Sequence, residues 1–314
     1  MTNAIVDVEP LDADLAGLVA RAARGEGLHQ MPVVEARRSY RKLIEDRSPD
    51  ASGTGVIVED VVVPMTDGGS LAARIYAPVA GSEGDAAILY LHGGGFVIGD
   101  LDTHDPLCRR LAAAVGTTLV SVAYRLAPEH PHAAARADAV GALTWMLARA
   151  RLADAPWSRI VIAGDSAGAN LAVWTALAQG AATLAGLVLI YPHVSFGFQS
   201  ASRTARADDA MLPAATIAHF GATSMPLGED PSLLDEALGQ LPPTLIVTAG
   251  HDPLRDDGVA LADAIVRAGG SVDRLHFPTL VHGFANLGHR SRGASSAIDD
   301  IATVMRRLVG SPPR

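Results

Sequence analysis

Ser166 is the third residue of the motif GDSAG, which directly follows the apolar run RIVIA and precedes the helical run AGANLAVWTALA. A tight strand-to-helix turn of this kind lifts a serine hydroxyl above the edge of a sheet and needs small residues on both sides. A bare GxSxG motif occurs by chance in roughly one chain in five of this size, so its position between a strand and a helix carries more weight than the motif. The pattern predicts a nucleophilic serine; a glycine-rich turn that binds a phosphate, or nothing, is the alternative.

A second glycine-rich motif, HGGG, begins at His92 after the strand-like run ILYL. Three consecutive glycines allow unusual backbone angles that turn N–H groups toward a ligand. We expect the N–H groups of Gly93 and Gly94 to stabilise the oxyanion of a tetrahedral intermediate, together with that of Ala167 at the helix N-terminus after the serine. His92 is expected to anchor the loop. Both motifs follow strands in the required chain order, which disfavours a merely flexible turn.

A nucleophilic serine needs a base, and the base needs a group that fixes its tautomer. Among eleven histidines, His282 follows the last predicted strand, in a loop that can reach the serine. His276 falls within the strand pattern and His289 lies further along, and we expect structural or surface roles for both. His130 and His132 are spaced like metal ligands, but no third ligand accompanies them, so no metal site is predicted.

The acid is expected between nucleophile and base in the chain, at the end of the penultimate strand. Asp252 lies in the connection after the predicted strand 244–249. Asp256 and Asp257 come where the next helix begins, and we interpret them as charges that favour the helix N-terminus through its dipole. Asp252 is therefore the predicted acid. A serine, aspartate and histidine in this chain order would cleave an acyl bond through a covalent intermediate, without a cofactor.

Alternating strands and helices must position these residues. A hairpin is predicted at 56–64 and 71–77 around the turn 67–69, and the later strands are 86–91, 117–123, 160–164, 184–191, 244–249 and 271–277. The predicted helices around them are 106–115, 133–150, 167–179, 256–268 and 294–308. This order predicts an α/β fold with a mostly parallel eight-stranded sheet and the hairpin at one edge. Ligands bind beyond the carboxyl ends of such strands.

Two segments lie outside this alternation. Residues 12–24 and 33–46 form two predicted amphipathic helices before any strand. About fifty residues separate the strands ending at 191 and beginning at 244, far more than a typical connection; there, 195–206 is polar and loop-like and 212–220 weakly helical. We expect a lid that packs with the N-terminal helices, which divides the chain into cap helices (1–50), a first catalytic part (51–194), a cap insertion (195–240) and a second catalytic part (241–314).

Composition excludes several classes of function. The net charge of −9 opposes the phosphate backbone of nucleic acid. The first residues are acidic where a signal peptide is basic, and no run approaches ~20 apolar residues, which predicts a soluble, cytoplasmic protein without stable membrane association. The single cysteine, Cys108, excludes an intramolecular disulfide and fits a core position in a helix.

Several runs of this sequence can be compared with those of known protein families. They are HGGGFVIGDLDTHD from His92, YRLAPEHP from Tyr124, GDSAG from Gly164, HDPLRDDG from His251 and HGF from His282. With these runs, the chain resembles the bacterial hormone-sensitive-lipase-like family of α/β-hydrolase esterases. The resemblance implies a catalytic α/β domain with a helical cap and cofactor-free hydrolysis of esters with short to medium acyl chains. It also assigns the triad to Ser166, Asp252 and His282.

Two positions depart from the family pattern. Ala169 replaces the second glycine of the usual GDSAGGN, and YRLAPEHP continues into His132 and Ala133 where Phe-Pro is common. Neither change removes a catalytic group. The same scaffold also serves receptors, which bind a ligand, and dehydratases, which catalyse an elimination. A receptor predicts loss of a triad member, whereas here all three candidates are present. Cleavage of amides, lactones or carbamates stays open, as does a homodimer.

Overall fold

The computed structural model describes residues 9–44, 55–65, 68–82, 85–151, 157–225 and 229–310. Within these residues one eight-stranded sheet has the order β1-β2-β4-β3-β5-β6-β7-β8. Its strands are β1 (Val56–Pro64), β2 (Ser70–Pro78), β3 (Ala86–Leu91), β4 (Leu119–Val122), β5 (Arg159–Asp165), β6 (Leu184–Ile190), β7 (Thr244–His251) and β8 (Val272–Val281). The hairpin pairs antiparallel with β4, and all later pairings are parallel. The predicted fold class is confirmed.

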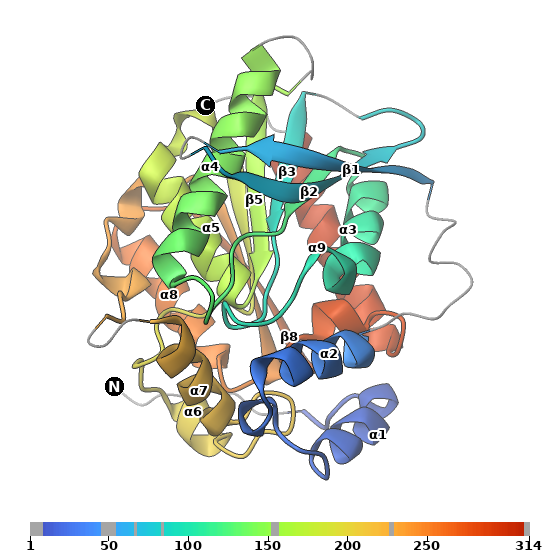
Figure 1. Ribbon diagram of the computed structural model, residues 1–314, viewed down its shortest axis with the longest axis vertical. Coiled ribbons are helices and arrows are strands. Elements are labelled where there is room, and N and C mark those ends of the chain that lie inside the picture. The colour runs from blue at the N-terminus through green and yellow to red at the C-terminus, as the bar shows by residue number, and fades with distance from the viewer. Residues whose placement is uncertain are drawn as a thin grey trace.

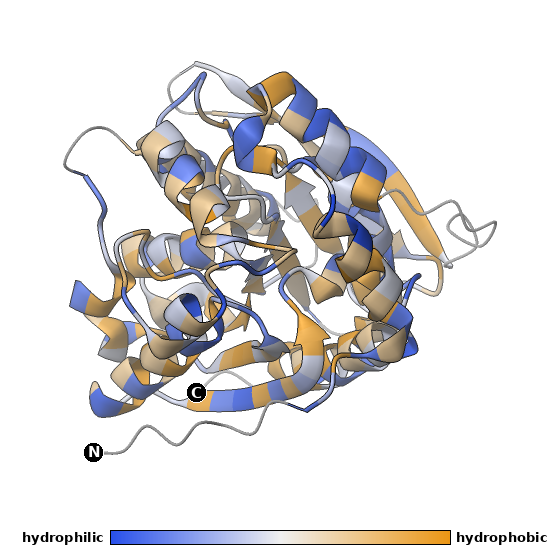
Figure 2. Cartoon of the chain, turned by 90° about the horizontal axis from the view of Figure 1, so that it is seen from below, coloured by the Kyte–Doolittle hydropathy of each residue, from blue (hydrophilic) through white to orange (hydrophobic). Residues whose placement is uncertain are grey.

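Helices cover both faces of the sheet. Figure 1 shows α4 (His132–Arg151), α5 (Ala167–Gln179) and α8 (Arg255–Arg267) on one side, and α3 (Leu101–Val115) and α9 (Arg292–Gly310) on the other. The central strands β3 and β6 are buried along their whole length, which explains their continuous apolar sequences. In Figure 2 the strands at the centre are mostly hydrophobic, whereas the surrounding helices mix hydrophobic and hydrophilic residues.

Several element boundaries differ from the sequence prediction. Helix α3 begins at Leu101 rather than residue 106, because the Asp100 side chain caps it by accepting a hydrogen bond from the Thr103 N–H at 2.8 Å. Pro106 lies inside this helix. Strand β8 continues past residue 277 to Val281, which carries the chain to the carboxyl edge of the sheet. The predicted helix end at 45–46 and turn residue 67 lie outside the described residues.

Four helices gather where the parallel strands end: α1 (Ala13–Ala22), α2 (Val33–Ile44), α6 (Ala201–Ala205) and α7 (Ala214–Ser224), seen at the lower end of Figure 1. Helix α6 falls in the segment expected to be loop-like. His29, in the short helix Leu28–Gln30, lies with its Nδ1 atom 2.9 Å from Oγ1 of Thr216 on α7. Segments 187 residues apart in the chain therefore meet beyond the carboxyl ends of the parallel strands.

Helix α2 is tied to the loops beneath it by Arg37. Its Nε donates to the carbonyl of Val97 at 2.9 Å, and its two terminal nitrogens donate to Glu129, each at 2.7 Å. These hydrogen bonds lower the pKa of Glu129 to about 2. Arg125 pairs instead with the buried carboxylate of Asp138 at 2.6 Å. The charged residues of YRLAPEHP thus anchor helices and loops.

The remaining described helices are short 3-10 turns at Ala181–Thr183, Leu233–Asp235, Leu238–Gln240 and Phe284–Leu287. Cys108 is buried in α3 with its thiol free, as expected. None of the helices in the described ranges is long and apolar enough to cross a lipid bilayer.

Candidate active site

Ser166 occupies a strained turn between β5 and α5. Its backbone angles are φ 53° and ψ −115°, a conformation that residues with a side chain rarely adopt. A Cβ atom on Gly168 would lie 1.9 Å from the Leu91 carbonyl oxygen, and one on Gly164 would lie 2.5 Å from the Gly168 backbone. The two glycines of GDSAG are therefore required because the turn packs against β3, as the sequence predicted for this motif.

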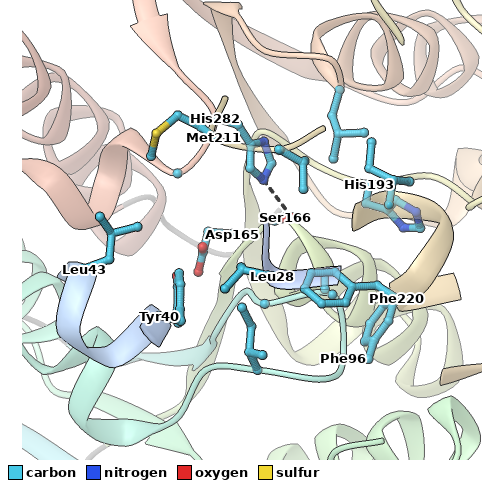
Figure 3. A pocket seen from close by; sticks show the side chains of 18 of the residues that line it. Leu28, Tyr40, Leu43, Phe96, Asp165, Ser166, His193, Met211, Phe220 and His282 are labelled. Atoms are coloured by element: carbon cyan, nitrogen blue, oxygen red, sulfur yellow. Dashed lines mark hydrogen bonds between the residues drawn. The ribbon is translucent and has the colours of Figure 1, made fainter. Parts of the chain in front are cut away.

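Three predicted residues meet at the carboxyl edge of the sheet. His282, just past β8, has Nε2 3.1 Å from Oγ of Ser166 and Nδ1 2.9 Å from Oδ2 of Asp252. Figure 3 marks the first of these contacts. Asp252, just past β7, is fully buried, and its other oxygen accepts the Leu254 N–H at 2.7 Å. One hydrogen-bonded line thus joins residues from three strand ends.

The charge state of His282 is set by its neighbours. Burial is the largest single influence and lowers the pKa of this imidazole, but the Asp252 carboxylate, Asp165 and Asp209 together raise it, so the net shift is upward. A carboxylate bonded to Nδ1 also holds the tautomer in which Nε2 is free to accept a proton. The environment thus favours proton uptake by His282.

The loop that begins at His92 requires a correction for Gly93. Its N–H donates to Oδ1 of Asp165 at 2.9 Å and is therefore not available to a substrate. Gly94 and Gly95 line the cavity beside Ser166 instead, together with Ala167. In the part of the chain that the structure describes, the N–H groups of these three residues donate to no protein acceptor. At this cavity, Gly95 rather than Gly93 therefore presents an unbonded N–H beside that of Gly94.

Asp165 links the two glycine motifs, and sequence reasoning missed its role. It accepts hydrogen bonds from Gly93 and from the Tyr90 hydroxyl at 2.8 Å, and its Oδ1 lies 3.3 Å from Nε2 of His104. Burial raises the pKa of this carboxyl, but His104 and the hydrogen bond from the Tyr90 hydroxyl lower it. The net shift of the pKa is downward. The signal was present in the sequence, because an ionisable residue directly precedes the serine within the motif.

His92 has the predicted structural role in the loop. Its ring stacks on Tyr124 with centroids 4.2 Å apart, and its Nδ1 lies 2.9 Å from the Gly93 carbonyl. Burial, followed by the nearby His104, lowers the pKa of His92 to about 4. A neutral ring packed in this way fixes the start of the loop.

A cavity of about 90 Å³ lies above Ser166 (Figure 3). It is lined by residues of α2, α7 and the loops around them, and its walls are mainly apolar. They include Leu28, Tyr40, Leu43, Phe96, Phe196, Met211, Leu212, Ile217, Phe220 and Leu287. Polar groups are few and come mostly from Ser166, His282, Asp165 and His193. An apolar cavity with a few convergent polar groups is typical of a small-molecule site.

Residues 88–286 match a family described by its α/β-hydrolase fold. The chain belongs to this family. It is 40% identical to the esterase LipI of Mycobacterium tuberculosis over 69% of this chain and 71% of the relative, and 34% identical to the carboxylic ester hydrolase LipN of the same organism over 97% and 85%. A solved esterase of Pyrobaculum calidifontis superimposes with a TM-score of 0.84 at 32% identity, covering 96% of this chain and all of the other. The resemblance to hormone-sensitive-lipase-like esterases is confirmed.

Within this α/β hydrolase, the interpretation of Asp257 as a simple helix-end charge is incomplete. Asp257 does lie in the first turn of α8, but it is fully buried and paired with Arg203 at 2.6 Å. Burial raises its pKa to about 6, opposed by the hydrogen bonds from Arg203. Asp256 accepts the Ser202 N–H at 2.8 Å. Both carboxylates therefore hold the segment before β7 rather than act only on the helix dipole.

Three other histidines of this α/β hydrolase, His130, His132 and His276, do not line the cavity. His276 on β8 contacts the Thr248 hydroxyl at 2.8 Å, and His132 is buried at the start of α4 against Phe96. His130 directly follows Glu129, whose carboxylate accepts a hydrogen bond from Arg37 on α2. Among the described residues, no group of three or more His, Cys, Asp or Glu side chains is arranged to hold a metal ion.

Proposed function

We propose that Ser166, His282 and Asp252 act as nucleophile, general base and orienting acid in the hydrolysis of carboxylic esters. The protein is a carboxylic ester hydrolase, in keeping with its esterase relatives. The observation that carries the assignment of roles is the line Asp252–His282–Ser166, with contacts of 2.9 and 3.1 Å, at the floor of an apolar cavity. Nucleophile, base and orienting group in such a line are the signature of acyl transfer.

In the first half-reaction the Ser166 oxygen attacks the ester carbonyl carbon while Nε2 of His282 takes the hydroxyl proton. The carboxylate of Asp252 stabilises the imidazolium. The negative oxygen of the tetrahedral intermediate accepts hydrogen bonds from the N–H groups of Gly94, Gly95 and Ala167. The carbon–oxygen bond to the alcohol then breaks, and the alcohol leaves with the proton from His282.

In the second half-reaction a water molecule attacks the acyl carbon, and His282 takes one of its protons. The same N–H groups hold the second oxyanion. The bond to Ser166 breaks, the proton returns to its oxygen, and the carboxylic acid leaves. The complete cycle converts one ester and one water molecule into one carboxylic acid and one alcohol, with no oxidant or reductant.

We further propose short to medium acyl chains as substrates, because the cavity is small and its walls are mainly apolar. The segments 9–44 and 195–240 would form the cap that closes it, since α2 and α7 supply several of its walls. A cytoplasmic location, the absence of nucleic-acid binding and a homodimer remain predictions. They are tested separately by fractionation, by binding assays and by the mass of the protein in solution.

Covalent labelling tests the proposed nucleophile. An organophosphonate should modify the wild type once, at Ser166, and Ser166→Ala should lose several orders of magnitude in kcat for a p-nitrophenyl ester while keeping its melting temperature. Ser195→Ala is the matched control, because Ser195 is also buried near the cavity but does not contact His282. A label on another serine, or near-normal turnover by Ser166→Ala, would contradict the assignment.

A further inference from the structure

His193 is a cavity residue that the proposed mechanism does not use. It lies just after β6, and its N–H is 3.4 Å from the Ser166 carbonyl oxygen, which fixes its backbone beside the nucleophile. Its side chain lines the cavity, and Figure 3 shows the ring on the same wall as Phe96 and Phe220. The residue is only 4% exposed. The ring of His193 forms part of the cavity wall with both nitrogens below the wall surface, so a half-turn of the ring about its Cβ–Cγ bond is needed to present one of them to a substrate.

Neither ring nitrogen of His193 has a hydrogen-bond partner among the described residues. The ring packs instead against Phe196 and Phe96, at centroid distances of 4.3 and 6.2 Å. Buried polar groups in native proteins are nearly always satisfied, and an unsatisfied one costs stability that an apolar side chain of the same shape would avoid. The described residues thus leave the donor and acceptor capacity of His193 open to a bound molecule.

The ring of His193 is neutral at physiological pH. Burial and the nearby Arg203 hold its pKa well below the ordinary histidine value. A neutral imidazole offers one N–H donor and one acceptor. It therefore suits an uncharged oxygen, such as a hydroxyl or a carbonyl. A carboxylate in this cavity would instead face the negative charges of Asp165 and Asp252.

We propose that His193 determines specificity by hydrogen bonding to a neutral oxygen on the substrate, separate from the reacting ester group. The preferred substrates are then esters that carry a hydroxyl or carbonyl a few bonds from the scissile carbonyl. This inference rests on the proposed function, because the substrate must be held above Ser166. A site that hydrogen-bonds a substrate oxygen rejects the analogue without it more strongly than an apolar wall rejects an extra methyl group.

Matched esters that differ by a hydroxyl in place of a methyl group test the proposal. On the acid side the pair is ethyl 3-hydroxybutanoate and ethyl 3-methylbutanoate; on the alcohol side it is 2-hydroxyethyl butanoate and propyl butanoate. For each pair the kcat/KM ratio is divided by the ratio of the base-catalysed hydrolysis rates. In the wild type we expect one corrected ratio to exceed that of His193→Phe about tenfold, which corresponds to about 1.4 kcal/mol. The pair that responds identifies the side of the ester that His193 contacts.

Two further variants separate recognition from packing. His193→Asn retains a donor and an acceptor and should keep part of the preference. His132→Phe is the matched control, because His132 is also buried against the Phe96 ring, at 4.5 Å, but does not line the cavity. It should leave both ratios unchanged.

The outcomes of this experiment are distinct. Corrected ratios near one in the wild type overturn the role of His193, whether or not His193→Phe folds. Equal ratios in the wild type and a folded His193→Phe overturn it as well. In both cases esters are still hydrolysed and Ser166 is still labelled. Failure of the proposed function would instead appear as no phosphonate label on Ser166.

Discussion

Arg203 and Asp257 form a buried ion pair with N–O distances of 2.6 and 3.0 Å, although 54 residues separate them in the chain. Arg203 lies on α6 and also donates to the carbonyls of Ser195 and Phe196, while Asp257 accepts the Val194 N–H at 3.1 Å. These contacts fix the chain just after β6 onto α8. They therefore position one wall of the cavity.

Asp257→Ala leaves the Arg203 guanidinium buried without its counter-charge, so we expect a loss of about 3–5 kcal/mol in the free energy of unfolding. Urea denaturation measures it. Asp256→Ala is the control: its carboxylate is partly exposed and mainly caps a backbone N–H, so removing it should cost about 1 kcal/mol. Equal, small losses in both variants would show that burial of the ion pair is energetically unimportant.

Asp252→Asn should reduce kcat near neutral pH by roughly 10³–10⁴. The amide keeps the shape of the carboxylate but neither fixes the Nδ1–H tautomer of His282 nor stabilises the imidazolium. Steady-state assays with a p-nitrophenyl ester, alongside melting temperatures, measure the effect. Asp256→Asn is the matched control because it lies four residues away and does not contact His282. Near-wild-type turnover by a folded Asp252→Asn protein would remove Asp252 from the triad.

The pH profile should report the upward shift in the pKa of His282. Its imidazole must be neutral to accept the serine proton, so kcat/KM is lost as pH falls through this pKa. Because Asp252 raises the pKa, the acidic limb should lie above the ordinary histidine value. In Asp252→Asn the limb of the residual activity should move to lower pH. An acidic limb that is unaffected by this substitution would assign it to another group.

Acyl-chain length should be limited by the aromatic wall of the cavity. Phe220 on α7 is 5% exposed and packs closely on the loop that begins at His92. A Cβ on Gly95 in that loop would lie 2.0 Å from the Phe220 ring. We expect kcat/KM for p-nitrophenyl acetate to hexanoate to exceed that for the palmitate ester. Phe220→Ala should shift the optimum to longer chains. Faster hydrolysis of the palmitate ester by the wild type would require an acyl tunnel absent from the described cavity.

The sequence by itself determined the fold class, and it predicted the three residues that meet at the carboxyl edge of the sheet. Strand–turn–helix context predicted the nucleophile at Ser166, because such a turn needs small residues on both sides of the serine. Chain order then selected Asp252 and His282, since successive parallel strands bring their carboxyl ends to one edge. The predicted start of α3 was wrong and α6 was missed, because side-chain caps and contacts with other segments determine where such helices form.

Only the tertiary structure decided which polar groups are free to act. Gly93 and Gly95 are indistinguishable in sequence, but the carboxylate of Asp165, 72 residues away, takes the N–H of Gly93. Asp256 and Asp257 are also indistinguishable in sequence, but in the structure Asp257 is fully buried and paired with Arg203. His193 belongs to no motif, and only the structure shows that its two ring nitrogens lack hydrogen-bond partners among the described residues. The physical reason is common to all three: burial and hydrogen-bond satisfaction depend on partners that are distant in the chain.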